Sequence, residues 1–165
     1  MKFIADAMLG RLAKWLRVLG FDTLYYPDIE DGQLVKISRE QERTILTRDT
    51  NLLKRRGLPG AVFIRDDDVF DQLRQIGSLL DVSYASPMGR CMICNGVLGP
   101  VGARDEVRDL VPEFVFLHFN EFARCGGCGR VYWGGSHQKR MKEKIKGIFP
   151  DYAGLPFSAG NEGGH

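Results

Sequence analysis

The sequence of 165 residues lacks any long hydrophobic run, because no apolar stretch approaches the ~20 residues that span a bilayer. Its first residues also lack the layout of a secretory signal peptide, since their apolar stretch is broken by Asp6 and followed by Arg11 and Lys14. The sequence has no internal repeat and no long low-complexity segment. These absences predict a cytoplasmic protein with no membrane partner.

Cysteine and net charge are both scarce. The chain has four cysteines and a net charge of +2, and residues 1–86 carry equal numbers of basic and acidic side chains. Cytosolic thiols stay reduced, so four cysteines there favour metal ligation over disulfides. Residues 136–148 are the local exception, with five basic residues and one acidic residue. Such a segment is typical of a surface that binds a polyanion.

The first half of the chain alternates strands with helices. Apolar and β-rich patterns predict strands at 2–6, 22–26, 44–47 and 61–64, and helices at 8–19, 34–41, 51–56 and 69–80. This alternation is typical of a parallel sheet with helices on both faces. The active crevice of such a sheet lies beyond the carboxyl ends of its strands.

The composition changes near residues 83–89, after which glycine is frequent and β-rich segments appear at 113–119 and 130–133. Residues 136–148 are predicted to form a basic helix with Ser136 as its N-cap. We expect three parts: an α/β domain at 1–86, a small β-rich module with the basic helix at 87–148, and a flexible tail at 149–165.

The cysteines form two CxxC pairs separated by thirty residues: Cys91, Cys94, Cys125 and Cys128. Two such pairs can offer four thiolates in the tetrahedral array of a structural Zn²⁺ site. The alternatives are a redox dithiol or buried thiols, and His118 or His137 could replace one cysteine as a ligand. A small glycine-rich module lacks a large core, so zinc is expected to supply much of its folding energy.

Three carboxylates follow predicted strands. Asp6 ends the first strand, Asp31 follows the second and Asp49 follows the third, so all three are expected at one edge of the sheet. Carboxylates brought together repel one another unless a cation neutralises them, and hard oxygen ligands suit Mg²⁺ or Mn²⁺. Asn51 could add a ligand. Such ions activate water, so the pattern indicates phosphodiester hydrolysis.

A structural interpretation of these acids stays open. Asp31 can cap a helix and Asp49 can end a strand, while Asp28 or Glu30 could replace Asp31 at the metal. Capping and the helix dipole explain Asp66, Asp67 and Asp68 more readily than metal binding does, although they could join the site.

Basic residues accompany the acids. Arg11, Lys14 and Arg17 are expected on the polar side of the first helix, and Arg48 precedes Asp49. They could hold substrate phosphates, although each could equally belong to a solvated surface. Tyr132 and Trp133 could stack on bases beside the predicted basic helix, or Trp133 could belong to the core. The cations of that helix are Lys139, Arg140, Lys142, Lys144 and Lys146.

Four segments resemble the Mut-seven C-terminal ribonuclease-domain family, a PIN-like domain fused to a zinc ribbon: DAMLGRLAKWLRVLGFDT, LTRD, CMICNG and CGGCGRVYWGGSH. The resemblance covers residues 3–145. It implies a PIN-like α/β fold, metal-dependent RNA cleavage by Asp6, Asp31 and Asp49, and zinc at the cysteines. One departure is Asn51, which stands where related chains often carry a second aspartate.

Three functions follow as hypotheses. The first is an Mg²⁺- or Mn²⁺-dependent ribonuclease, with tRNA and rRNA as candidate substrates and a homodimer as a candidate assembly. The second is a non-catalytic RNA- or ribosome-binding zinc-ribbon protein with a vestigial acidic site, which Asn51 keeps open. The third is a partner in a toxin–antitoxin-like pair.

Overall fold

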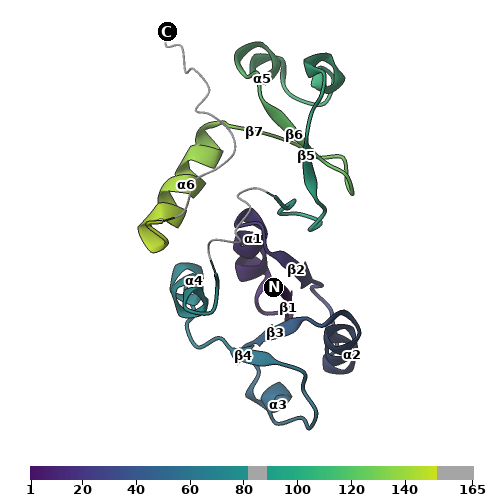
Figure 1. Ribbon diagram of the computed structural model, residues 1–165, viewed down its shortest axis with the longest axis vertical. Coiled ribbons are helices and arrows are strands. Elements are labelled where there is room, and N and C mark those ends of the chain that lie inside the picture. The colour runs from purple at the N-terminus through teal and green to yellow at the C-terminus, as the bar shows by residue number, and fades with distance from the viewer. Residues whose placement is uncertain (82–88, 152–165) are drawn as a thin grey trace.

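The computed structural model describes residues 1–81 and 89–151 (Figure 1). The boundary expected near residues 83–89 and nearly all of the expected tail lie outside the described residues. In the view of Figure 1 a parallel sheet occupies the lower part of the molecule and a smaller sheet the upper part, with helix α1 (Gly10–Val18) between them.

A four-stranded parallel sheet forms the first part, in the order β2-β1-β3-β4, and confirms the predicted α/β class. Its strands are β1 (Lys2–Ala5), β2 (Asp22–Tyr25), β3 (Thr44–Thr47) and β4 (Ala61–Phe63). The other helices of this part are α2 (Asp31–Gln41), α3 (Thr50–Leu53) and α4 (Val69–Gly77). All the elements predicted in this part are therefore present.

Helices cover both faces of the sheet. Successive side chains of each strand point to opposite faces, so both faces carry apolar side chains that the helices bury. Phe3 and Leu46 point into the core that α1 and α4 complete, whereas Ile4 and Ile45 point into the core that α2 and α3 complete. Strand β2 lies beside β1 and strand β4 lies beside β3, so the chain builds the sheet outward in opposite directions from the β1–β3 pair. The strand order therefore reverses at this pair. The crevice that such a reversal opens lies at the carboxyl ends of β1 and β3.

The second part contains a three-stranded antiparallel sheet in the order β5-β6-β7, followed by the predicted basic helix. Its elements are β5 (Leu98–Pro100), the short 3₁₀ helix η2 (Arg104–Val107), α5 (Glu113–His118), β6 (Phe122–Cys125), β7 (Val131–Trp133) and α6 (Ser136–Ile148). The strand predicted at 130–133 is confirmed.

The strand predicted at 113–119 is wrong, because this segment forms α5. A short, continuous apolar run has no period that separates a strand from a helix. Here Val115 and Phe116 are buried against Val107, while Phe114 and Leu117 remain exposed. A strand would bury alternate residues on one face, whereas a helical turn can bury two adjacent residues, as it does here.

One hydrophobic core joins the two parts. The core beneath α1 and α4 also contains Cys91, Cys125 and Tyr132 from the cysteine region, together with Met141 and Ile145 from α6. Phe149 closes this core against α4, where a Cβ on Gly77 would lie 2.7 Å from its ring. The domain boundary expected between residues 86 and 87 thus separates two segments whose side chains pack into one core.

Asn95 makes a polar connection between the two parts. Its side-chain Oδ1 accepts a 3.0 Å hydrogen bond from the backbone N–H of Thr23 on the edge strand β2, and its Nδ2 donates to Asp22 at 2.8 Å. Partial burial alone would raise the pKa of Asp22, but hydrogen bonds from Arg43 and Asn95 lower it below its ordinary value. Asp22 therefore stays charged, which keeps it as an acceptor for Asn95.

Arg17 makes a second connection and does not lie on the polar side of α1, as the sequence had suggested. Its side chain is only 6% exposed. The guanidinium donates to the carbonyl of Thr23 at 2.9 Å and to the carbonyls of Met92 and Ile93, each at 3.1 Å. Arg17 thus binds the backbone between the first two cysteines and is not available to substrate.

We predict that Asn95→Gly lowers the free energy of unfolding by about 2 kcal/mol, because the buried N–H of Thr23 loses its acceptor. Asn95 has a φ of 69°, a left-handed conformation that glycine adopts freely, so the backbone itself is not strained by this change. Urea unfolding followed by circular dichroism measures the effect.

The matched control is Glu42→Gly, at an exposed left-handed position with a φ of 55°. It should leave stability unchanged or slightly higher. Equal losses in both variants would mean that glycine's chain entropy, and not the Asn95 hydrogen bonds, causes the effect.

Candidate functional site

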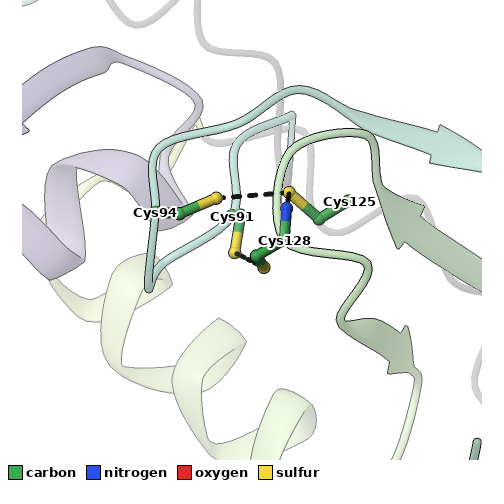
Figure 2. Close-up of side chains that lie close together, drawn as sticks. All are labelled: Cys91, Cys94, Cys125 and Cys128. Carbon is green, nitrogen blue, oxygen red and sulfur yellow. Dashed lines mark hydrogen bonds between the residues drawn. The ribbon is translucent and has the colours of Figure 1, made fainter.

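The four cysteine sulfur atoms gather in one cluster (Figure 2). All four lie within 4.8 Å of one another, with 3.7 Å between Cys91 and Cys128 and 3.4 Å between Cys94 and Cys125. Thiolates bound to a tetrahedral Zn²⁺ at ~2.3 Å would be about 3.8 Å apart. The cluster therefore has the dimensions of a four-thiolate metal site.

The two cysteine pairs sit on similar turns. The amide of Asn95 donates to the carbonyl of Cys91 at 2.9 Å, and the amide of Gly129 donates to the carbonyl of Cys125 at 3.0 Å. Both turns close on a left-handed residue, with φ values of 69° at Asn95 and 76° at Gly129. In each pair the first cysteine is buried and the second exposed, so the cluster lies between the core and the surface.

Hydrogen bonds to sulfur prepare the cluster for negative charge. The amides of Gly96 and Gly127 approach the sulfurs of Cys94 and Cys125 at 3.4 and 3.3 Å. The hydroxyl of Tyr132 lies 3.1 Å from the sulfur of Cys91 and can donate to its thiolate. Such donors around the ligands hold thiolates in place and tune their charge.

The pKa values of Cys91 and Cys94 shift in opposite directions because the two sulfur atoms have different hydrogen-bond donors and neighbours. Burial alone would raise the pKa of Cys91, but hydrogen bonds from Tyr132 and backbone amides lower it to about 7. The Gly96 amide favours the Cys94 thiolate, but burial and the three neighbouring sulfurs raise the pKa of Cys94 to about 11. Four thiolates cannot share this space without a cation, so the cluster suits a bound metal ion.

Other expected contributors lie outside the cluster. Tyr132 is 6% exposed and bonds to Cys91, so it is not available for base stacking. His118 is stacked on Phe114 and its Nδ1 lies 2.7 Å from the Phe114 carbonyl. Among the described residues the cluster consists of the cysteines alone.

Asp6 lies at the carboxyl end of β1, beside the β1–β3 crevice, and is only 7% exposed. Its Oδ2 accepts hydrogen bonds from the Thr47 hydroxyl at 2.6 Å and the Arg48 amide at 2.8 Å, and its Oδ1 accepts from the Met8 amide at 2.9 Å. These contacts use three of its roughly four acceptor positions, which leaves one on Oδ1.

Thr47 links Asp6 to Asp49. The Thr47 hydroxyl that donates to Asp6 also accepts a 2.9 Å hydrogen bond from the Asp49 amide. Asp49 caps α3, with its Oδ1 accepting from the Asn51 amide at 2.8 Å. The structure thus brings Asp6 and Asp49 to the same edge, and Thr47 is the residue that sequence reasoning missed.

Asp31 is the first residue of α2, where Glu30 occupies the N-cap position, and no hydrogen bond joins Asp31 to the other two acids. Within residues 1–81 and 89–151 the acids form no cluster as tight as that of the cysteines. Asp68 caps α4 by accepting from two backbone amides. Asp67 pairs with Arg48 at 2.5 Å, so the Arg48 guanidinium is turned toward the loop before α4.

The cations of α6 are largely solvent-exposed, apart from the half-buried Lys142. None of them forms an ion pair with a described residue. The Lys144 ammonium lies 4.9 Å from the Phe70 ring, at the start of α4. Arg11 and Lys14 are also exposed on α1. Unpaired cations on two neighbouring helices can bind phosphate groups.

A family model described as the Mut7-C RNAse domain matches residues 1–145 of the chain. The matched range contains all four cysteines and the three acids discussed above. No curated protein and no solved structure matches the chain. Among the described helices, none has the length and apolar character needed to cross a membrane.

We predict that Gly96→Ala weakens metal binding roughly 10- to 100-fold, because its Cβ would lie 2.7 Å from the sulfur of Cys125 and 3.2 Å from that of Cys94. The sulfurs must then move apart. Competition between the protein and a chromogenic chelator for Co²⁺ measures the affinity, and the visible ligand-field bands of bound Co²⁺ report the geometry.

Gly99→Ala is the control, since a Cβ there meets nothing within 4 Å. If both variants bind Co²⁺ as the unmodified chain does, the close approach of Gly96 to the cluster is not required for metal binding.

Proposed function

This chain belongs to the Mut7-C RNAse domain family, and from that premise we propose that it is a ribonuclease that depends on a divalent metal. The observation that carries the proposal is the pairing of Asp6 and Asp49 through Thr47, at the point where the strand order of the sheet reverses. Ligand sites in parallel sheets occur at this point.

Two carboxylates are enough for the metal in this proposal. Mg²⁺ keeps several of its waters and commonly binds proteins through one or two carboxylates. Asp6 has a free acceptor position and Asp49 uses one oxygen for capping, so each can offer an oxygen. Asp31 would join as a third ligand or through a water. The loose arrangement of the acids is therefore compatible with a hydrated hard cation.

A bound Mg²⁺ or Mn²⁺ would supply an activated water and neutralise charge on the scissile phosphodiester. The residues of the chain would hold the RNA beside it. Arg11 and Lys14 are exposed on the helix that follows Asp6, and the ammonium of Lys144 on α6 lies over Phe70 at the start of α4. These positions favour an RNA backbone that crosses from α6 toward the carboxyl edge of the parallel sheet.

The four cysteines are proposed to bind Zn²⁺ in a structural role. All four coordination positions would be filled by protein, which leaves no open position for substrate, as in structural zinc sites. The support is the size of the cluster and its amide donors. Zinc would fix the turns that hold Asn95 and the carbonyls contacted by Arg17.

We predict that removal of zinc unfolds both parts of the chain in one transition. Structural zinc contributes about 10–16 kcal/mol, comparable to or above the total stability of a typical domain. Each part contains one tryptophan, Trp15 on α1 and Trp133 on β7, so Trp133→Phe and Trp15→Phe variants report on the parts separately. Fluorescence during titration with a zinc chelator measures the loss.

Coincident loss of both signals is the expected result, because Cys91 and Cys125 lie in the core that α1 and α4 share. A Trp15 signal that survives full zinc removal would instead show that residues 1–81 fold by themselves.

Asp49→Asn should reduce RNA cleavage at least about a hundredfold, the scale of losing one transition-state contact. Asparagine is as good an N-cap as aspartate, so α3 should stay capped while the metal loses a charged ligand. Cleavage of a labelled RNA with added Mg²⁺ or Mn²⁺ measures the effect.

The matched control is Asp68→Asn, which makes the same change at the N-cap of α4. It should keep full activity. Activity that is equal in Asp49→Asn and the unmodified chain would reject the proposed site, and loss in Asp68→Asn alone would move the metal to residues 66–68.

A non-catalytic RNA-binding protein is the second candidate. Its support is that, among the described residues, the acids do not gather as the cysteines do, and that Asp6 already accepts three hydrogen bonds. RNA binding without divalent ions, together with no cleavage in Mg²⁺ or Mn²⁺, would favour this candidate.

A further inference from the structure

A cavity of about 490 Å³ lies where α1, the first cysteine pair, β7 and the start of α6 meet. Its volume is within the range of roughly 300–1,000 Å³ that is typical of small-molecule sites. The segment from Arg130 to Gln138 forms most of its wall. This segment corresponds to the RVYWGGSH motif of the sequence, to which the metal sites assign no role beyond the contact of Tyr132 with Cys91.

The charge of the cavity suits an anion. Among the described residues that line it, none is acidic, whereas Lys14, Arg130 and His137 are basic. The N-terminus of α6 also opens there. Gly135 is the N-cap in place of the predicted Ser136, and no side chain caps the helix. The first amides of this thirteen-residue helix are therefore available to a phosphate.

Gln138 provides a second observation that points to a ligand. Gln138 is one of the residues that line the cavity and is 7% exposed, yet its buried Oε1 has no hydrogen-bond partner among the described residues. Buried polar atoms are nearly always paired. Because the amide can turn about its last side-chain bond, it can present either its oxygen or its N–H groups to an occupant of the cavity.

Trp133 gives the cavity an aromatic wall. Trp133 is partly exposed: it packs against the core that contains Val107 and Val131, and its Nε1 edge lies against Gly135, where a Cβ would be only 3.1 Å away. Ile93, which is 53% exposed, adds an apolar surface from the loop of the first cysteine pair. An aromatic residue beside an anion site and an amide with an unpaired oxygen matches the three parts of a nucleotide: base, phosphate and polar base edge.

We propose that this cavity binds one nucleotide, with its phosphate at the N-terminus of α6 near Lys14, its base against Trp133 and the edge of that base at Gln138. The proposal rests on the proposed ribonuclease function and names the place where the chain would hold a single unit of its RNA. The same chemistry would also accept a free nucleotide, and the experiment separates these two sources.

The binding test uses the Trp15→Phe variant with zinc bound, so that Trp133 is the only tryptophan and can be excited selectively. Nucleoside 5′-monophosphates are added in a buffer without Mg²⁺ or Mn²⁺. We expect saturable quenching by nucleotides, with the corresponding nucleosides and inorganic phosphate each binding at least about tenfold more weakly, because each lacks one of the two contacts.

Two further changes test individual contacts. Lys14→Gln should weaken nucleotide binding about tenfold, whereas Lys36→Gln, at an exposed lysine of α2 outside the cavity wall, should not change it. Gln138→Leu should weaken binding about tenfold and raise the melting temperature, because it removes an unpaired buried oxygen. A purely structural Gln138 would instead lower the melting temperature when replaced.

The source of the nucleotide follows from a second titration with a short single-stranded oligoribonucleotide. Tighter quenching by the oligoribonucleotide than by the monophosphates supports an RNA subsite, and equal affinity supports a free nucleotide. Absence of saturable quenching by both ligands, or inorganic phosphate that binds as tightly as the nucleotides, would overturn the proposal. Because this test contains no catalytic metal, its failure leaves the prediction for Asp49 standing.

Discussion

The contact between the first cysteine pair and strand β2 is the constraint on which the rest of the molecule depends. Asn95 adopts a left-handed conformation and pairs its side-chain amide with the edge of the parallel sheet, while Arg17 holds the carbonyls of Met92 and Ile93. Both contacts need the turn that the cysteine cluster forms. A metal at this cluster would therefore determine how the small sheet and α6 sit on the α/β part.

Helix α1 brings three functional features together because different faces of it meet different neighbours. It begins shortly after Asp6, presents Lys14 to the cavity below α6, and sends Arg17 to the loop of the first cysteine pair. The buried face, with Leu12 and Leu16, packs in the core that also contains the cysteines. A single nine-residue helix thus couples the acidic edge, the proposed nucleotide site and the metal cluster.

Features with a regular period or spacing could be predicted from the sequence, and features set by tertiary contacts could not. The alternation of strands and helices predicted the parallel sheet, and the spacing of the two CxxC pairs predicted the cysteine cluster. The apolar run of α5 has no period, so its helix was missed. Arg17 has the type and spacing of a surface residue, and only its long-range acceptors at positions 92 and 93 cause its burial. The unpaired oxygen of Gln138 likewise leaves no trace in the sequence.

The hydrogen bond from Thr23 to Asn95 also bears on self-association of the protein in concentrated solution. Strand β2 is an edge strand, and exposed edge N–H groups can pair with a strand of another molecule. By accepting the hydrogen bond of Thr23, the Asn95 side chain closes this edge with a group too short to continue the ladder. The turn that holds a metal would then also protect the chain from intermolecular β pairing, and apo-protein would carry a sheet edge open to self-association.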